Sequence, residues 1–120
     1  MNKRNVIDML VERCLADIDV LIASASVDGF IIGYTSDFET RRKDYMRIGI
    51  PHVYAIATSL ESELALEVEK QLFCKCVEDK RLIRYKKYHA EKRDKSYIRS
   101  SGGKNAEGVP CVVYVACIST

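Results

Sequence analysis

Hydrophobic residues along the chain follow two spacings, one typical of helices and one typical of strands. Helical spacing predicts a helix over residues 5–16, a second over 38–48, and a long third that starts at a Thr58–Glu61 capping box and ends near Cys76. The run "DVLIASASVDGFIIGYT" predicts two strands joined by a "VDG" hairpin turn, "HVYAIAT" a third, and residues 110–118 a buried last strand. This order predicts an α+β fold, a small and mainly antiparallel sheet flanked by helices.

The helix over 38–48 carries an arginine on its apolar face. Ser36 or Asp37 is the expected N-cap, and Gly49 and Pro51 end the helix. At about 100° per residue, Phe38, Tyr45 and Ile48 share one face, and Arg41 lies among them. An arginine in that position needs a charged partner or a function.

The long helix carries a second charge on its apolar face. Glu69 lies inside a stripe that comprises Leu60, Leu64, Ala65, Leu66, Val68, Leu72, Phe73 and Cys76. A carboxylate held there is paired, bound to a metal ion, or protonated. Two hypotheses stay open at this point: an Arg41–Glu69 ion pair that clasps the fold, or a functional site.

Composition places the chain among ordinary globular proteins. With 120 residues, 48% of them hydrophobic and 30% charged, residues 1–120 are expected to form a single domain. No apolar run approaches the ~18 residues needed to span a bilayer, and charges interrupt the N-terminus too early for a secretory signal. We therefore expect an intracellular protein with no membrane partner.

The five cysteines are expected to be free thiols of a reducing compartment. They cannot all pair within one chain. Cys74 and Cys76 lie roughly 200° apart around the predicted helix, which opposes joint chelation of one ion. A zinc set completed by His52 and His89 runs against the usual ligand spacing.

Charge is unevenly distributed along the chain. Residues 1–79 hold 9 Lys/Arg against 14 Asp/Glu, whereas residues 80–104 hold 10 against 2. The basic segment 80–104, a C-terminal extension to the fold, interleaves cations with tyrosines, a pattern suited to phosphates and unpaired bases. The nucleic-acid-binding candidates are Arg81, Arg84, Lys86, Lys87, Lys92, Arg93, Lys95 and Arg99.

Two alternatives to nucleic-acid binding remain for the basic segment. Lysine-rich surfaces are common on proteins with no polyanion partner. The segment could also dock on the acidic face of a neighbouring subunit, and the extra N-terminal helix, apolar on most sides, favours a protein partner or self-association.

The two misplaced charges belong to a stretch that resembles the GIY-YIG nuclease superfamily. The similar residues span about 18–75 and include "GYTSDFETRRKDY" and "ALEVEKQLF". The matched positions are Gly33, Thr35, Phe38, Arg41, Tyr45 and Glu69. The resemblance implies a Mg²⁺-dependent DNA endonuclease in which Glu69 holds the metal ion, Arg41 steadies the scissile phosphate, and tyrosines, Tyr45 among them, help activate water.

The signature tyrosines of that family are missing from their expected places. Ile31 stands where the second triplet needs tyrosine, "VLIASAS" lacks the first triplet, and Tyr34 alternates to the opposite side of its strand from Ile31. Loss of a general base costs about 10²–10⁴ in rate, which favours a DNA-associated, catalytically degenerate domain over a residual endonuclease. The alternative is a structural or assembly protein. Such domains are frequent in phages, mobile elements and large DNA viruses, so a component of a viral particle is one form of it.

Overall fold

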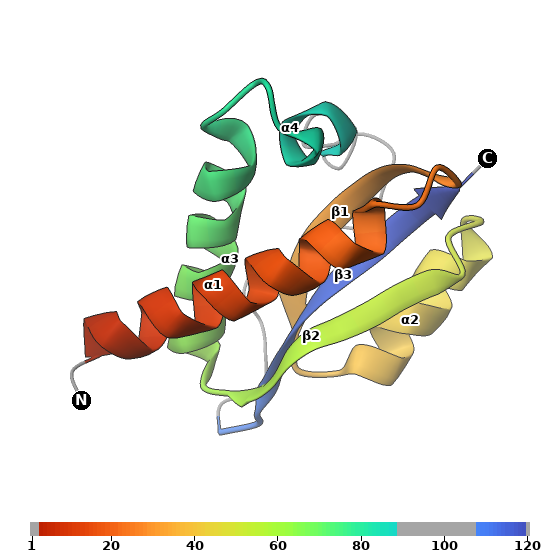
Figure 1. The fold of residues 1–120 in the computed structure, drawn as a ribbon. Helices are drawn as coiled ribbons and strands as arrows, with labels where there is room; N and C mark the ends of the chain where they lie inside the picture. The colour runs from red at the N-terminus through yellow and green to blue at the C-terminus, as the bar shows by residue number, and fades with distance from the viewer. Residues whose placement is uncertain (1–2, 89–107, 120) are drawn as a thin grey trace.

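The computed structural model describes residues 3–88 and 108–119, which form an α+β domain (Figure 1). The predicted fold class is confirmed. In chain order the elements are α1 (Lys3–Ile22), β1 (Val27–Thr35), α2 (Phe38–Arg47), β2 (His52–Leu60), α3 (Ser62–Val77), α4 (Ile83–Lys87) and β3 (Cys111–Ser119).

The last strand of the chain is the central strand of the sheet. The sheet has the order β1-β3-β2, and β3 pairs antiparallel with both neighbours. Gly33 of β1 lies opposite Tyr114, and Ala55 of β2 lies opposite the same tyrosine from the other side. Buried on both faces, β3 matches the continuous apolar run predicted for it.

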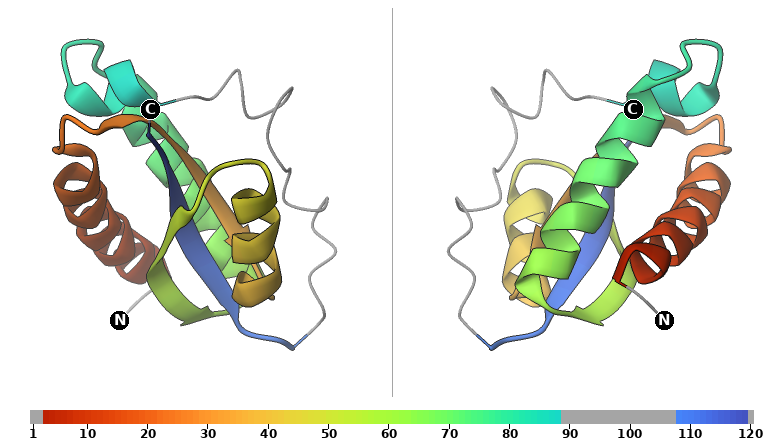
Figure 2. Two further views of the ribbon diagram at one scale, coloured as in Figure 1. Left: turned by 90° about the vertical axis from the view of Figure 1, so that its right-hand side faces the viewer. Right: turned by 90° about the vertical axis from the view of Figure 1, so that its left-hand side faces the viewer.

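Helices cover the two faces of the sheet unequally. Helices α1 and α3 pack on one face, where Ile18 and Val68 join Ile32 and Val115 in the larger hydrophobic core. On the opposite face α2 is the one helix among the described residues, and its Tyr45 joins Ile31 and Tyr114 in a smaller core. Figure 2 shows the strands between α1 and α2.

The predicted N-terminal hairpin is wrong, because the first helix is longer than expected. Cys14, Ile18 and Ile22 are all buried at spacings of four residues, so the apolar side chains of "DVLI" continue one helical stripe. The "VDG" sequence does not turn the chain. It lies inside β1, where the pairing register shifts between Val27 and Gly29, so it forms a β-bulge.

The helix boundaries also correct two details. Of the two predicted N-caps of α2, Ser36 and Asp37, the structure has Asp37, whose carboxylate accepts from the Thr40 N–H at 3.1 Å. That helix ends at Arg47, so Ile48 leaves the apolar face and is 45% exposed. The Thr58 capping box does not form, because β2 keeps pairing with β3 as far as Leu60 and moves the N-cap of α3 to Glu61.

The state of the cysteines and the length of the apolar helices bear on two further predictions. All five cysteines are free, and Cys74 alone among them is exposed. In the part of the chain that the structure describes, no helix is both long and apolar enough to cross a membrane.

Candidate functional site

Helix α2 directs one positive charge into the molecule. Arg41 and Tyr45, four residues apart and so on one helical face, are its two buried residues, and Arg41 is only 8% exposed. Its neighbour Arg42 is partly exposed by contrast, with 32% of its side chain accessible, and pairs with Glu39 at 3.0 Å. The helix thus separates a surface ion pair from an arginine held against the sheet.

Tyr114 of the central strand meets this face of α2. Its hydroxyl lies 3.3 Å from that of Tyr45, within hydrogen-bond distance, and the two rings pack edge to face with centroids 5.7 Å apart. Burial is the main cause that raises the pKa of Tyr114, and Tyr45 adds to it, whereas the charge of Arg41 lowers it. Tyr114 is therefore protonated at neutral pH and is electrostatically coupled to Arg41.

Gly33 makes room for Tyr114. A Cβ built on Gly33 would lie 2.3 Å from Tyr114 Oη and 2.5 Å from its Cζ, far closer than atoms can pack. The phenol ring therefore lies across β1 at this residue, and any side chain would displace it. The close approach of the Tyr114 ring to the backbone of β1 explains why a glycine stands in the middle of the buried run "FIIGYT".

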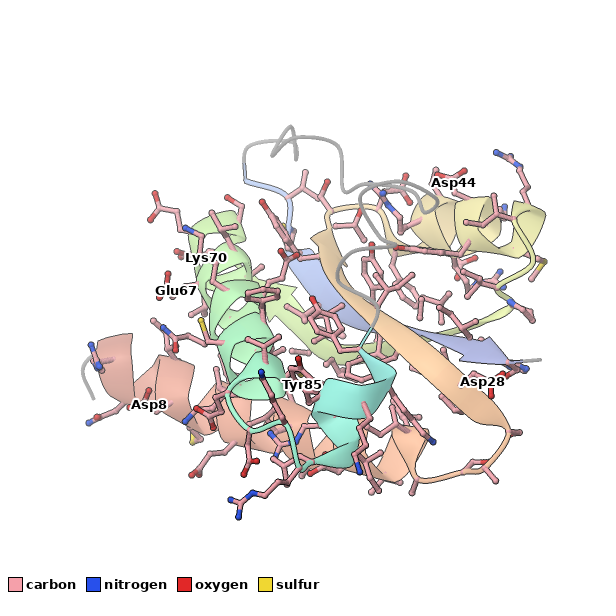
Figure 3. The ribbon with its side chains drawn as sticks, turned by 90° about the horizontal axis from the view of Figure 1, so that it is seen from above. Asp8, Asp28, Asp44, Glu67, Lys70 and Tyr85 are labelled. Atoms are coloured by element: carbon pink, nitrogen blue, oxygen red, sulfur yellow. The ribbon has the colours of Figure 1, made fainter. Side chains whose placement is uncertain are left out.

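Glu69 approaches the same tyrosine from α3. Its Oε2 atom is buried, and its negative charge contributes to raising the pKa values of both Tyr114 and Tyr34. Tyr34 belongs to the core under α1 and α3, whereas Tyr114 belongs to the core under α2. Glu69 thus acts on tyrosines of both faces, which places it beside the edge strand β1. Glu67 and Lys70 of α3 point away from the sheet, as Figure 3 shows.

The three catalytic candidates of the sequence converge on a residue that the sequence did not single out. Tyr45 contacts Tyr114 directly, while Arg41 and Glu69 both act on its pKa. The Arg41–Glu69 ion pair stays a prediction. Tyr114 escaped notice because it stands in a strand about 80 residues beyond β1. The one sequence signal was "VVY", an apolar pair followed by tyrosine inside a strand.

Among the described residues, the site offers a metal ion one carboxylate, that of Glu69. Within residues 3–88 and 108–119, no three His, Cys, Asp or Glu side chains gather in a group that could enclose a metal ion. Mg²⁺ commonly keeps several waters and takes only one or two carboxylates together with substrate phosphates. Glu69 can serve as that single carboxylate, because one of its oxygens is buried beside a group of polar side chains.

The basic segment is used partly for packing. Arg84 pairs with Asp19 at 3.0 Å, Lys87 Nζ donates to the carbonyls of Ile22 and Ser24 at 2.7 and 3.1 Å, and Arg81 pairs with Asp79 at 2.9 Å. Lys86 is exposed. The other nucleic-acid candidates, Lys92, Arg93, Lys95 and Arg99, lie outside the described residues, as does His89 of the zinc hypothesis.

Comparisons with known proteins add no relative. No protein-family model matches the chain, and neither the curated proteins nor the solved structures yield a match. The geometry around Tyr114 therefore carries the functional argument.

Proposed function

We propose that this protein is a DNA-associated domain of the GIY-YIG type that hydrolyses phosphodiester bonds with a divalent cation. The single observation that carries the proposal is the place of Tyr114. In the resembled family the first tyrosine triplet lies on the strand before the "IIG" strand. Here "VVY" lies on the C-terminal strand, antiparallel to β1 and with Tyr114 opposite Gly33. In this proposal Tyr114, brought beside β1 by strand pairing, takes the place of the first-triplet tyrosine that is absent from the residues before β1.

The surrounding side chains have distinct roles in this proposal. Arg41 offers a permanently charged, planar fork to two phosphate oxygens. Tyr114, which is protonated and has its hydroxyl 3.3 Å from that of Tyr45, would donate a hydrogen bond to the phosphate, with Tyr45 then donating to Tyr114. Glu69 would hold the cation, which when bound would supply Lewis-acid polarisation of the phosphate and a more acidic water. Buried walls around these groups strengthen each electrostatic interaction.

Supercoiled plasmid tests the proposal, with Mg²⁺ or Mn²⁺ present. The parent protein is expected to convert the plasmid to the nicked form, and Glu69→Gln to reduce the rate by about 10²–10³, the usual effect of removing one electrostatic contributor. Glu67→Gln is the matched control, since it makes the same change on the outward side of α3 and is expected to nick at the parent rate. Equal rates for Glu69→Gln and Glu67→Gln would contradict the proposal.

A structural role is the second candidate, and one observation favours it. Arg41 is 8% exposed and Tyr114 1%, so a substrate must open the site before it can bind. A protein that only clasps its fold, for example as an assembly component of a viral particle, has no such need. In that case the parent does not nick DNA, and Glu69→Gln lowers the free energy of unfolding.

A further inference from the structure

A cavity lies on the face of the sheet that α1 covers, opposite the face with Tyr45 and Tyr114. It has a volume of about 300 Å³ and opens where the start of β1, the start of β2 and the end of β3 meet the end of α1. Its lining includes His52, Tyr54, Ser24, Ser26 and Ser119. Nothing in the proposed hydrolysis uses these residues. The volume is at the lower end of the range for small-molecule sites.

Two aromatic rings stand parallel on one wall of this cavity. His52 and Tyr54 alternate with Val53 along β2 and so project to the same side of the strand. Their ring planes differ by 8°, and their centroids are 6.5 Å apart. This spacing corresponds to the distance between alternate residues of a strand, about 6.6 Å. The two rings together make this wall aromatic, and aromatic rings are the groups on which unpaired bases stack.

The rim beside the rings is polar and held in place. The hydroxyls of Ser24 and Ser26 lie 2.8 Å apart, and the Ser26 N–H donates to Ser24 Oγ at 3.2 Å. Lys87 fixes this loop by donating to the carbonyls of Ile22 and Ser24. Because each serine hydroxyl has one proton and two lone pairs, the pair keeps capacity for the donors and acceptors of a base edge.

We infer that this cavity, the His52–Tyr54 slot, binds an unpaired nucleobase of a nucleic-acid strand. The ligand class follows from the parallel rings and the hydroxyl rim, and the choice of a polymer rests on the proposed function. Val53, between the two rings, packs in the core under α2, so the slot faces away from Tyr45 and Tyr114. The captured base therefore belongs to a different nucleotide from the one whose phosphate meets Arg41. The slot directs the protein to DNA with single-stranded segments.

Fluorescence of 2-aminopurine in a short single-stranded oligonucleotide tests the slot. In EDTA, the parent is expected to quench the probe by stacking and to bind it. Tyr54→Ala is expected to lose about 5- to 150-fold in affinity, since base stacking on one aromatic ring contributes that much. Tyr54→Phe keeps the ring and is expected to stay within about 3-fold of the parent.

Tyr85→Ala is the matched control. Tyr85 is 37% exposed and Tyr54 is 42% exposed, but Tyr85 belongs to α4 and does not line the cavity. The inference is overturned if the parent does not quench the probe, if Tyr54→Ala binds as the parent does, or if Tyr85→Ala loses as much affinity as Tyr54→Ala.

Failure of the slot and failure of the nuclease are separable. Binding is measured without metal, and Glu69→Gln is expected to quench the probe as the parent does. A protein that nicks plasmid but does not quench lacks the slot. One that quenches but does not nick keeps the slot and loses the proposed hydrolysis.

Discussion

At the scale of single residues, the site depends on one missing side chain. Gly33 permits the ring of Tyr114 to cross β1 and reach the surroundings of Arg41 and Glu69. Tyr114 and Tyr45 then join two elements through their hydroxyls. The glycine therefore shapes the site without contributing any chemistry to it.

Substitution of Gly33 by alanine tests this packing. The added methyl group meets Tyr114 at 2.3 Å, so the ring or the strand must shift, and we expect a loss of about 1–3 kcal/mol in the free energy of unfolding. Urea denaturation measures the loss. In a Tyr114→Ala background the same substitution is expected to cost much less, because the obstacle is gone. Equal costs in the two backgrounds would disprove the contact.

Buried thiols set a limit on stability at alkaline pH. Burial raises the pKa of Cys14 to about 11 and that of Cys76 to about 12, from an ordinary 9.0. A raised thiol pKa stabilises the folded state fully below pH 9, and this contribution is lost as pH rises from 9 toward the folded pKa. We expect the free energy of unfolding to fall there by up to about 1.4 kcal/mol per pH unit for each thiol.

Replacement of one thiol isolates its contribution to the pH dependence of the free energy of unfolding. Cys76→Ala is expected to flatten the decline between pH 9 and 11 by one thiol's contribution, as measured by urea denaturation at a series of pH values. Cys74→Ala is the matched control, since Cys74 is exposed. An unchanged slope in Cys76→Ala would refute the assignment.

At the scale of elements, the sequence predicted most of the fold and part of the site. Periodicity identified α2, β2, α3 and β3, and put Arg41 and Glu69 on apolar faces. It misread "DVLI" because valine and isoleucine favour strands locally, whereas packing on α3 favoured a longer α1. Tyr114 was not predictable because its place follows from the pairing of β3 with β1, a contact between distant parts of the chain.

Helix α4 contacts α1 through two cations, Arg84, which pairs with Asp19, and Lys87. Lys87 donates to the carbonyls of Ile22 and Ser24 at the end of α1, where a positive charge also suits the helix dipole. We expect Lys87→Met to lower the free energy of unfolding by about 1–3 kcal/mol, the range for hydrogen bonds to charged groups, as measured by urea denaturation. Lys86→Met makes the same change at an exposed position and is expected to stay within about 0.5 kcal/mol of the parent. A similar loss in both variants would contradict the role of Lys87.

At the scale of the whole molecule, positive charge is unevenly distributed along the chain. The chain concentrates positive charge in residues 80–104, and part of that charge is already used to pack α4 on α1. The described residues on either side of residues 89–107 lie at the sheet, because Tyr88 forms a β-bridge with Phe30 of β1 and Cys111 begins β3.

Salt dependence tests the basic segment. If the four candidates outside the described residues (Lys92, Arg93, Lys95 and Arg99) each neutralise one phosphate, affinity for single-stranded DNA is expected to fall about 50-fold between 50 and 200 mM salt. Fluorescence anisotropy of a labelled oligonucleotide at a series of salt concentrations measures this affinity. Replacement of these four residues by glutamine is expected to flatten the dependence. A slope that stays unchanged in that variant would exclude them as phosphate contacts.

The central claim is that Tyr114, supplied by the last strand, completes a phosphodiester site. The most direct measurement compares the rates of plasmid nicking by Tyr114→Phe and by the parent in Mg²⁺. Both rates are measured at a temperature at which both proteins are fully folded. Loss of the hydroxyl is expected to lower the rate by about 10²–10³, because one donor to the phosphate is removed while the ring stays in place. A Tyr114→Phe variant that nicks at the parent rate, or a parent that does not nick at all, would contradict the account.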